Sequence, residues 1–552
     1  MKTLSKLFMA CGLIVGLAAC NKELAPEVNS PELPQQDNIY MAFNISMPAT
    51  RSTTDPSVDP QHPSTADPNI EVGTELESSI KHLRLVLVNP TDKKIVALSS
   101  PTLKRNALGE YICPFQSEEL VNASNAASTT KLNVFAFCGK ALSGIAADDF
   151  GQKVGDVLNV DKLYSLSGAE DATLWEENEF AMVNVAAVSF DLPKTNDLVT
   201  LYKDERHPFD LGTITVERLA ARFDLDVTPA HTVFTMPGGL VKITLEEAAL
   251  YNQSKSMYVI RRGNATGVNA ADVNTNWTDL FAFEQAANWY MVDDLAAEKN
   301  AFALQVKADP KAELANRADF FVDAAAPKYE QLSAIASNED SYAGTYSPWK
   351  YAVENVFPAP DGCENQVQKL TTLVSYRGKI SPAEGCPADL ADDFNGQPVY
   401  IHDGIMYGNL ERLQRAVKGD YKDPSKTGPE DEKFVINDKL VSSYNLAVGS
   451  KTNPEEVAAA LKASTEFQVF EGEYHVYYNY LNRHNNNGKD NETASMEYAV
   501  VRNNVYKLAV TTIKNYGLPE FHIEGPDETS NAYFTVDVKV LPWTVRINDI
   551  EF

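Results

Sequence analysis

The chain has 552 residues, of which 44% are hydrophobic and 10% aromatic, and its formal net charge is −28. This length exceeds what one hydrophobic core can organise, so we expect two to four domains, and the apolar fraction excludes a disordered chain. The negative charge argues against nucleic acid as a partner, because few basic side chains are left to neutralise phosphates.

The N-terminus has the features of an exported, lipid-anchored protein. Lys2 and Lys6 precede an apolar run over 7–19, which is too short to span a bilayer and typical of a signal peptide. The run ends in LAAC, where small residues lead into Cys20 as in a bacterial lipobox. We therefore predict a lipoprotein signal peptide over 1–20, with acyl chains on Cys20 that anchor the protein to the outer membrane. An ordinary secretory signal that contains a cysteine is the alternative.

A strand with one buried face follows a proline-rich tether. Its apolar side chains alternate with polar or small residues, which is the pattern of a half-buried β-strand. They are Ile39, Met41, Phe43, Ile45 and Met47.

A single basic residue stands directly behind this strand. Arg51 is the only Lys or Arg between residues 23 and 80, and 52–70 are rich in Pro, Ser, Thr and Asp. We expect 52–70 to be extended and loosely packed, so the bond between Arg51 and Ser52 is accessible to a trypsin-like protease. Residues 21–51 are then a propeptide with a removable strand. An incidental arginine in a linker is the other interpretation.

The body of the chain is mostly β. Strand-like runs separated by polar turns predict an N-terminal β domain over 71–212. A long strand predicted over 213–227 opens a C-terminal β domain that extends over 213–552. Within that domain, Asn453 and Pro454 predict the start of a short helix over 453–464.

The C-terminal residues alternate in two sets, separated where Pro542 is expected to break the ladder and act as a hinge. Both sets are patterned like β-strands. The first is Phe534, Val536, Val538 and Val540, and the second is Trp543, Val545, Ile547 and, after a shift at 548–549, Phe552.

Nothing in the sequence points to catalysis. The eight histidines have no metal-binding spacing, and no nucleophile elbow, phosphate loop or dinucleotide motif occurs. We expect no enzyme activity, no cofactor and no metal. The tyrosines of 474–480 suit either a sugar-stacking patch or a packed sheet.

Four cysteines belong to the mature body. Cys363 and Cys386 lie in Gly-flanked turns and are candidates for a disulfide worth roughly 3 kcal/mol. Cys113 and Cys138 lie in strand-like runs and are expected to be buried thiols.

Several of these stretches resemble the lipoprotein fimbrillins of Bacteroidetes, in particular the major shaft subunits of the short (minor) fimbriae. The resemblance covers the lipobox at Cys20 and the strand before Arg51. It also covers VERLAARFDLDV at 216–227, MEYAVVRNNVYKLAVTTI at 496–513 and FTVDVKVLPWTVRINDIEF at 534–552.

The resemblance implies a mostly β fold of two β-sandwich-like (transthyretin-like) domains with short helices and long loops. It implies export as an outer-membrane lipoprotein and cleavage after Arg51 by an Arg-specific or trypsin-like protease. The cell-surface fimbria then grows by donor-strand exchange between copies of the chain, with accessory anchor and tip subunits, and supports adhesion. A C-terminal strand of one subunit replaces the strand 39–47 of the next.

Two points stay open at this level. The donated strand is 533–540, 543–552 or both. The alternative function is a non-polymerising surface lipoprotein, either a fimbrial anchor or tip or a glycan-binding protein. In an uncleaved chain we expect 39–47 to lie in a sheet of the N-terminal domain.

Overall fold

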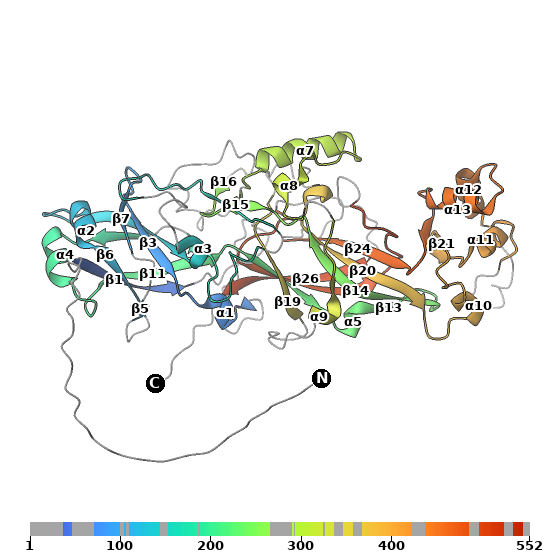
Figure 1. Ribbon diagram of the computed structural model, residues 1–552, viewed down its shortest axis with the longest axis horizontal. Helices are drawn as coiled ribbons and strands as arrows, with labels where there is room; N and C mark the ends of the chain where they lie inside the picture. The colour runs from blue at the N-terminus through green and yellow to red at the C-terminus, as the bar shows by residue number, and fades with distance from the viewer. Residues whose placement is uncertain are drawn as a thin grey trace, which may run out of the picture.

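The structure is a computed structural model. It describes residues 37–46, 71–99, 104–105, 110–143, 153–168, 171–185, 188–264, 290–291, 293–323, 326–335, 346–356, 367–421, 437–484, 496–523 and 534–544. The described elements form several β-sheets joined by short helices, and they follow one another along an elongated molecule (Figure 1). The prediction of a mostly β protein is confirmed.

The first sheet lies at one end of the molecule (Figure 1). In the described part of the chain its order is β4-β3-β7-β9-β11-β1-β6-β5, with β10 paired to β7. The strands are β1 (Asn38–Ser46), β3 (Leu83–Val88), β4 (Ile95–Leu98), β5 (Lys104–Arg105), β6 (Tyr111–Gln116), β7 (Thr130–Cys138), β9 (Met182–Asn184), β10 (Val188–Leu192) and β11 (Phe209–Arg218). Helices α2 (Ser117–Ala123), α3 (Lys140–Ser143) and α4 (Thr195–Leu201) lie beside it.

Alternate side chains of these strands enter different cores, as the two-residue period of a strand requires. On β3, Leu85 and Leu87 pack with β1, β6 and β11, whereas Val86 and Val88 pack with Phe137 in a second cluster. Both faces of β3 are therefore buried, which explains its continuous apolar sequence.

Two further sheets enclose the main core of the C-terminal part. The first has the order β19-β12-β25-β26-β2, and the second has the order β13-β14-β20-β24 with β18 paired to β14. The strands are β2 (Glu71–Val72), β12 (Ala221–Asp226), β13 (Val233–Thr235), β14 (Val241–Tyr251), β18 (Glu330–Gln331), β19 (Tyr346–Ala352), β20 (Leu373–Pro382), β24 (His475–Leu481), β25 (Asn504–Ile513) and β26 (Phe534–Thr544). Helices α1 (Glu75–Ser78), α5 (Pro229–Thr232) and α9 (Leu332–Ile335) border them.

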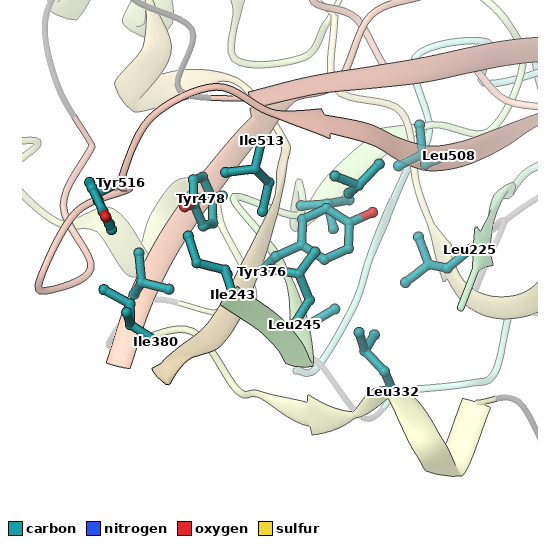
Figure 2. Close-up of a cluster of buried hydrophobic side chains, with 14 of the residues drawn as sticks. Leu225, Ile243, Leu245, Leu332, Tyr376, Ile380, Tyr478, Leu508, Ile513 and Tyr516 are labelled. Atoms are coloured by element: carbon teal, nitrogen blue, oxygen red, sulfur yellow. The ribbon is translucent and has the colours of Figure 1, made fainter. Parts of the chain in front are cut away.

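Side chains from both sheets fill this core, which makes the pair a β-sandwich. Figure 2 shows Leu225 and Leu508 from one sheet facing the same interior as Ile243, Tyr376 and Tyr478 from the other. Burying such large apolar side chains between two sheets is the main source of stability of a sandwich.

A small lobe forms the far end of the molecule (Figure 1). It has its own apolar cluster around Leu413, Leu440 and Leu461. Its elements are β21 (Val399–His402), β22 (Ile405–Met406), β23 (Gln468–Phe470), α10 (Ala388–Ala391), α11 (Leu410–Val417), α12 (Asp438–Val448) and α13 (Pro454–Lys462). The remaining elements are β8 (Leu163–Ser165), β15 (Ser256–Tyr258), β16 (Gly263–Asn264), β17 (Tyr290–Met291), α7 (Ala296–Ala308), α8 (Arg317–Phe320) and a 3-10 turn at Gln368–Leu370.

The predicted helix near 453 is confirmed. The side chain of Asn453 accepts a hydrogen bond from the backbone N–H of Glu455 at 2.9 Å, and Pro454 occupies the first turn of α13. Both residues act as the sequence indicates, because the cap satisfies an N–H that has no partner inside the helix.

Two strand predictions differ from the structure. The single strand expected over 213–227 is two strands, because the chain leaves the first sheet after Arg218 and enters the second at Ala221. The ladder is also not broken at Pro542, since β26 continues through it and Pro542 pairs with Asn504. On the edge of β26 that faces away from β25, the described pairing with β2 begins at Trp543, one residue after Pro542. A proline is tolerated in a strand where its missing N–H is not needed for a ladder.

Buried charged side chains surround the segment between β11 and β12, where the chain passes from the first sheet to the second. The guanidinium of Arg222 donates to both oxygens of Glu77 at 2.9 and 3.0 Å, and to both oxygens of Asp224 at 2.7 and 2.8 Å. Arg218 donates to the backbone oxygen of Glu77 at 3.0 Å, and the Tyr351 hydroxyl donates to the Glu77 carboxylate at 2.8 Å. We call this set the junction network.

The junction network fastens α1 to both sheets. Thr74 and Glu77 form a capping box, with the Thr74 N–H donating to the Glu77 carboxylate at 2.6 Å and the Glu77 N–H donating to the Thr74 hydroxyl at 3.1 Å. Burial disfavours the charged form of Glu77, but Arg222, the Thr74 N–H and Arg218 outweigh it, so the pKa of Glu77 lies below its usual value.

Replacing Glu77 with Gln tests the junction network. Glu77→Gln leaves Arg222 buried beside one carboxylate fewer and should cost about 3–5 kcal/mol of unfolding free energy at pH 7, measured by urea denaturation. Because the folded pKa of Glu77 is depressed, its contribution is present above the ordinary glutamate pKa and is lost as pH falls through the folded value. The difference between the two proteins should therefore shrink in acid.

The matched control is Glu176→Gln. Glu176 is paired with Lys140 at 3.5 Å on the surface, where such a pair contributes little. Equal effects of the two substitutions would contradict the importance of the junction network.

Candidate functional site

Strand β1 occupies a central position in the first sheet. It pairs parallel with β11, from Met41 opposite Phe209 to Ser46 opposite Thr215. On its other edge it pairs antiparallel with β6, from Asn38 opposite Gln116 to Phe43 opposite Tyr111. The prediction that this segment lies in a sheet of the N-terminal part is confirmed for its described residues, and Met47 lies outside them.

The inward side chains of β1 are part of the core. Ile39, Met41 and Phe43 have 0% exposure, and Ile45 is half-buried against the same cluster. The Phe43 ring stacks on Tyr111 with centroids 5.7 Å apart. Three fully buried apolar side chains stabilise the sheet by about 5–9 kcal/mol, at about 1.5–3 kcal/mol each.

Polar contacts at the ends of β1 are few and lie near the surface. Asp37 pairs with Lys203 at 3.0 Å, and the Ser46 hydroxyl lies 2.9 Å from that of Thr215. An exposed ion pair of this kind contributes little. Apolar burial and the two backbone ladders therefore hold β1 in place.

One irregularity interrupts the ladder between β1 and β11. Ala42 pairs with Asp210 and Asn44 with Thr213, so Phe43 faces two residues of β11. Gly212 has φ +76°, and its N–H donates to the Asp210 side chain at 2.7 Å. This is a β-bulge that needs glycine, and a glycine inside a strand pattern is the sequence signal that would have found it.

Cys113 lies on β6, directly opposite Met41 of β1 in the same sheet. Burial raises the pKa of Cys113 to about 12, and burial also raises the pKa of Cys138 on β7. The prediction that both are buried thiols is confirmed. A buried thiol with a raised pKa is unreactive, and β1 contributes to the core that buries Cys113.

The first C-terminal set of apolar residues lies within the chain's own second sheet. Its strand β26 pairs antiparallel with β25 over most of its length, from Phe534 opposite Ile513 to Pro542 opposite Asn504. Val536, Val538 and Val540 are inside this ladder, and Trp543 pairs with Glu71 of β2. Val545, Ile547 and Phe552 lie outside the described residues.

Several predicted sites fall on residues that the structure does not describe. These are the lipidation site Cys20, the processing site Arg51 and Ser52, and the segment 52–70. Cys363 also lies outside the described residues, so its disulfide with Cys386 stays a prediction. Cys386 itself is half-buried and is a free thiol in the structure.

Other kinds of site find little support in the described ranges. No cluster of His, Cys, Asp or Glu there is arranged to hold a metal ion, and no described helix is long and apolar enough to cross a membrane. Tyr474 and Tyr478 are buried in the sandwich core, so they pack a sheet and offer no face to a sugar.

The comparison with protein families agrees with the resemblance seen in the sequence. Residues 471–549 match the family described as "Major fimbrial subunit protein type IV, Fimbrillin, C-terminal". This stretch contains β24, β25 and β26, so the resemblance to fimbrillins is confirmed for the C-terminal part of the sandwich. No curated protein matches the chain.

Several solved structures of bacterial proteins are similar to the chain over most of its length at low identity. A fimbrilin from Porphyromonas gingivalis is 11% identical, with 92% of this chain and 98% of that chain covered and a TM-score of 0.35. A candidate cell adhesion protein from Parabacteroides distasonis is 11% identical, with 93% and 98% covered and a TM-score of 0.37. The tip fimbrial protein Mfa3 from Porphyromonas gingivalis, with a C-terminal truncation, is 9% identical, with 92% and 100% covered and a TM-score of 0.30.

Truncating Phe43 tests whether β1 is part of the core. Phe43→Ala should lower the unfolding free energy of the uncleaved, unlipidated chain by about 3–5 kcal/mol in urea denaturation, because it leaves a cavity against Tyr111. Asn44→Ala is the matched control, since Asn44 is exposed on the same strand and its loss should change stability by about 0.5 kcal/mol or less. A loss below about 1 kcal/mol for Phe43→Ala would show that β1 is not held by burial.

Proposed function

We propose that the protein is a structural, non-catalytic subunit of a cell-surface fimbria that supports adhesion. It is exported as an outer-membrane lipoprotein through Cys20 and activated by cleavage between Arg51 and Ser52. One observation carries the proposal: the central strand of the first sheet is the described segment that lies on the N-terminal side of Arg51.

Cleavage at Arg51 separates β1 from the rest of the fold. On the C-terminal side of the cut, the described chain resumes at β2, which pairs with β26, and at α1, which the junction network holds. These contacts keep the body intact. On the other side, β1 retains a covalent link only to the N-terminal tether, and only apolar burial and the two backbone ladders hold it in the sheet.

Loss of β1 would leave a gap in the first sheet, and another β-strand is the element that fits such a gap. The gap is flanked by β6 and β11, and each of these strands loses its backbone hydrogen-bond partners on the edge that faced β1. The inward side chains of these two strands, which belong to the same apolar core as those of β1, are Tyr111, Cys113, Phe115, Leu211, Ile214 and Val216. Two unpaired strand edges beside an exposed apolar core are a template for strand addition.

A C-terminal strand of a second copy is the proposed replacement. The donor and acceptor sites are different parts of the surface, so each added subunit presents a new acceptor, and the assembly is an open filament. Because β26 is already paired along its length with β25, the donated part is the segment that follows it. Fimbrial anchor and tip subunits and an Arg-specific or trypsin-like protease are the other proposed partners.

Processing of the purified, unlipidated chain tests the proposal. Trypsin should create a new N-terminus at Ser52 and convert the monomer into a ladder of oligomers that resists detergent without heating. Arg51→Ala should abolish both changes, since no other Lys or Arg lies between residues 23 and 80. Arg51→Lys is the matched control, because trypsin still cuts it and an Arg-specific protease does not. Clean cleavage that leaves only a monomer would point to a non-polymerising surface lipoprotein.

Cys113 reports directly on the presence of β1. Its thiol should resist alkylation in the uncleaved chain, react after cleavage when β1 is lost, and resist again in the oligomer. Peptide mass spectrometry measures the three states. Cys386 is a half-buried thiol outside the core that contains β1, and it is the internal control whose reactivity should be the same in all three states. Equal protection of Cys113 in all three states, with oligomers present, would show that β1 is never replaced.

A further inference from the structure

A lysine, an asparagine and an aspartate meet in the interior of the molecule beside α7. The Lys299 ammonium donates to the Asp293 carboxylate at 2.6 Å and to the side-chain oxygen of Asn355 at 2.7 Å. All three residues are buried, with exposures of 1% for Lys299, 5% for Asp293 and 0% for Asn355. A side-chain amine is thus held against a side-chain amide, and a carboxylate contacts the amine.

Separate parts of the chain hold the three groups in place. Asp293 lies just before α7, and its carboxylate also accepts from the N–H of Leu295 at 2.8 Å. Lys299 lies in the first turns of α7, which is on the outside of the molecule (Figure 1). Asn355 follows β19, and its backbone exchanges two hydrogen bonds with Val500, at 3.0 and 2.8 Å. The contact therefore joins α7 to the chain that leads out of the sandwich.

The amide of Asn355 is oriented by the partners of its nitrogen. Its Nδ2 donates to the Leu370 carbonyl at 3.0 Å and to the Thr372 hydroxyl at 2.8 Å. That hydroxyl donates in turn to the backbone oxygen of Asn252 at 2.8 Å, so it accepts from Nδ2. The amide oxygen therefore faces Lys299.

This orientation brings the lysine nitrogen close to the amide carbon. Because the Cγ–Oδ1 bond of Asn355 is about 1.2 Å long, the Lys299 Nζ lies within about 3.9 Å of Cγ. A shift of about 1 Å or less reaches the separation of about 3–3.5 Å from which two atoms react.

We propose that Lys299 and Asn355 form an isopeptide bond, with Asp293 as the group that accepts and returns the proton. Asp293 takes one proton from the Lys299 ammonium, and the amine nitrogen attacks Cγ of Asn355. The new N–C bond forms and the bond from Cγ to Nδ2 breaks. Nδ2 receives the proton that the attacking nitrogen loses and the proton held by Asp293. It leaves as ammonium, Asp293 is a carboxylate again, and no oxidant or reductant is needed.

Burial favours this chemistry. A proton that moves from Lys299 to Asp293 removes two charges from the protein interior, where charges are costly. Burial also keeps water from competing with the amine for Cγ. The junction network contains an equally buried pair of Arg222 with Glu77, but a guanidinium stays protonated and is not a nucleophile. A lysine can be one once it has lost its proton.

The bond closes residues 299–355 into a covalent ring. Helix α7 contributes Phe302 and Val306 to an apolar cluster that also contains Leu370 and Tyr498, so the ring ties this cluster together. Like a disulfide, the bond restricts the unfolded chain, but reducing agents do not open it. It involves neither β1 nor Arg51, so it is present before and after processing.

Mass spectrometry of the purified, unlipidated chain tests the bond. The intact mass should be lower than the mass of the sequence by one ammonia molecule. After denaturation, reduction and alkylation, trypsin should release peptide 351–369 joined to peptide 263–307, because an amidated Lys299 is not a trypsin site. Reduction excludes a disulfide of Cys363 as the link. A chain with the full sequence mass, or one linked at other residues, would overturn the inference.

Three variants assign the roles of the side chains. Lys299→Arg keeps a cation beside Asp293 but cannot form the amide, so it should have its full sequence mass. Lys369→Arg is the matched control and should still lose ammonia, since Lys369 is a buried lysine that pairs with Glu313 at 2.9 Å. Asp293→Asn should slow the appearance of linked peptide in freshly expressed chain roughly a hundredfold or more.

Circular dichroism shows whether each variant folds, and the mass of the unmodified chain decides the bond even where a variant does not. Linking at the normal rate in a folded Asp293→Asn chain would overturn the role of Asp293. Loss of ammonia from Lys299→Arg would overturn the role of Lys299.

Discussion

The proposed assembly depends on the position of β1 in the sheet and in the sequence. The strand is hydrogen-bonded on both edges, yet it precedes Arg51 in the sequence, whereas the rest of the described fold follows Arg51. Removal of such an interior strand breaks two ladders and opens the core beside Cys113 and Tyr111 at the same time. A sheet in that state either loses order or takes up another strand. Retention of β1 and its loss therefore define two states of one molecule.

The junction network explains how the walls of the site survive without β1. Strand β11 is fixed at its far end by Arg218, whose guanidinium contacts Glu77 and Ser78, and its neighbour Glu217 is paired with Arg261. Buried ion pairs add little net stability, but removing one partner is costly, so they define geometry more than they strengthen it. The wall that carries the bulge is thus held by contacts in which β1 takes no part.

Local patterns in the sequence predicted local structure well. The alternation from Ile39 to Ile45 identified β1, and the Asn453–Pro454 pair identified α13. Partners distant in sequence were not predictable. No residue near β1 in the sequence indicates that β11 lies beside it. From the sequence alone, Arg222 would be expected on the surface, because its partner Glu77 is distant in the sequence. The continuity of β26 through Pro542 was missed for the same reason, because it depends on which edge of the strand is paired.

Hydrogen exchange at the amides of β6 and β11 tests most directly the claim that a strand of another copy takes the place of β1. The account predicts slow exchange at these amides in the uncleaved chain, fast exchange in cleaved monomers that have lost β1, and slow exchange again in the oligomer, with β25 slow throughout. Oligomers in which β6 and β11 still exchange fast, or cleaved monomers in which they never do, would contradict it.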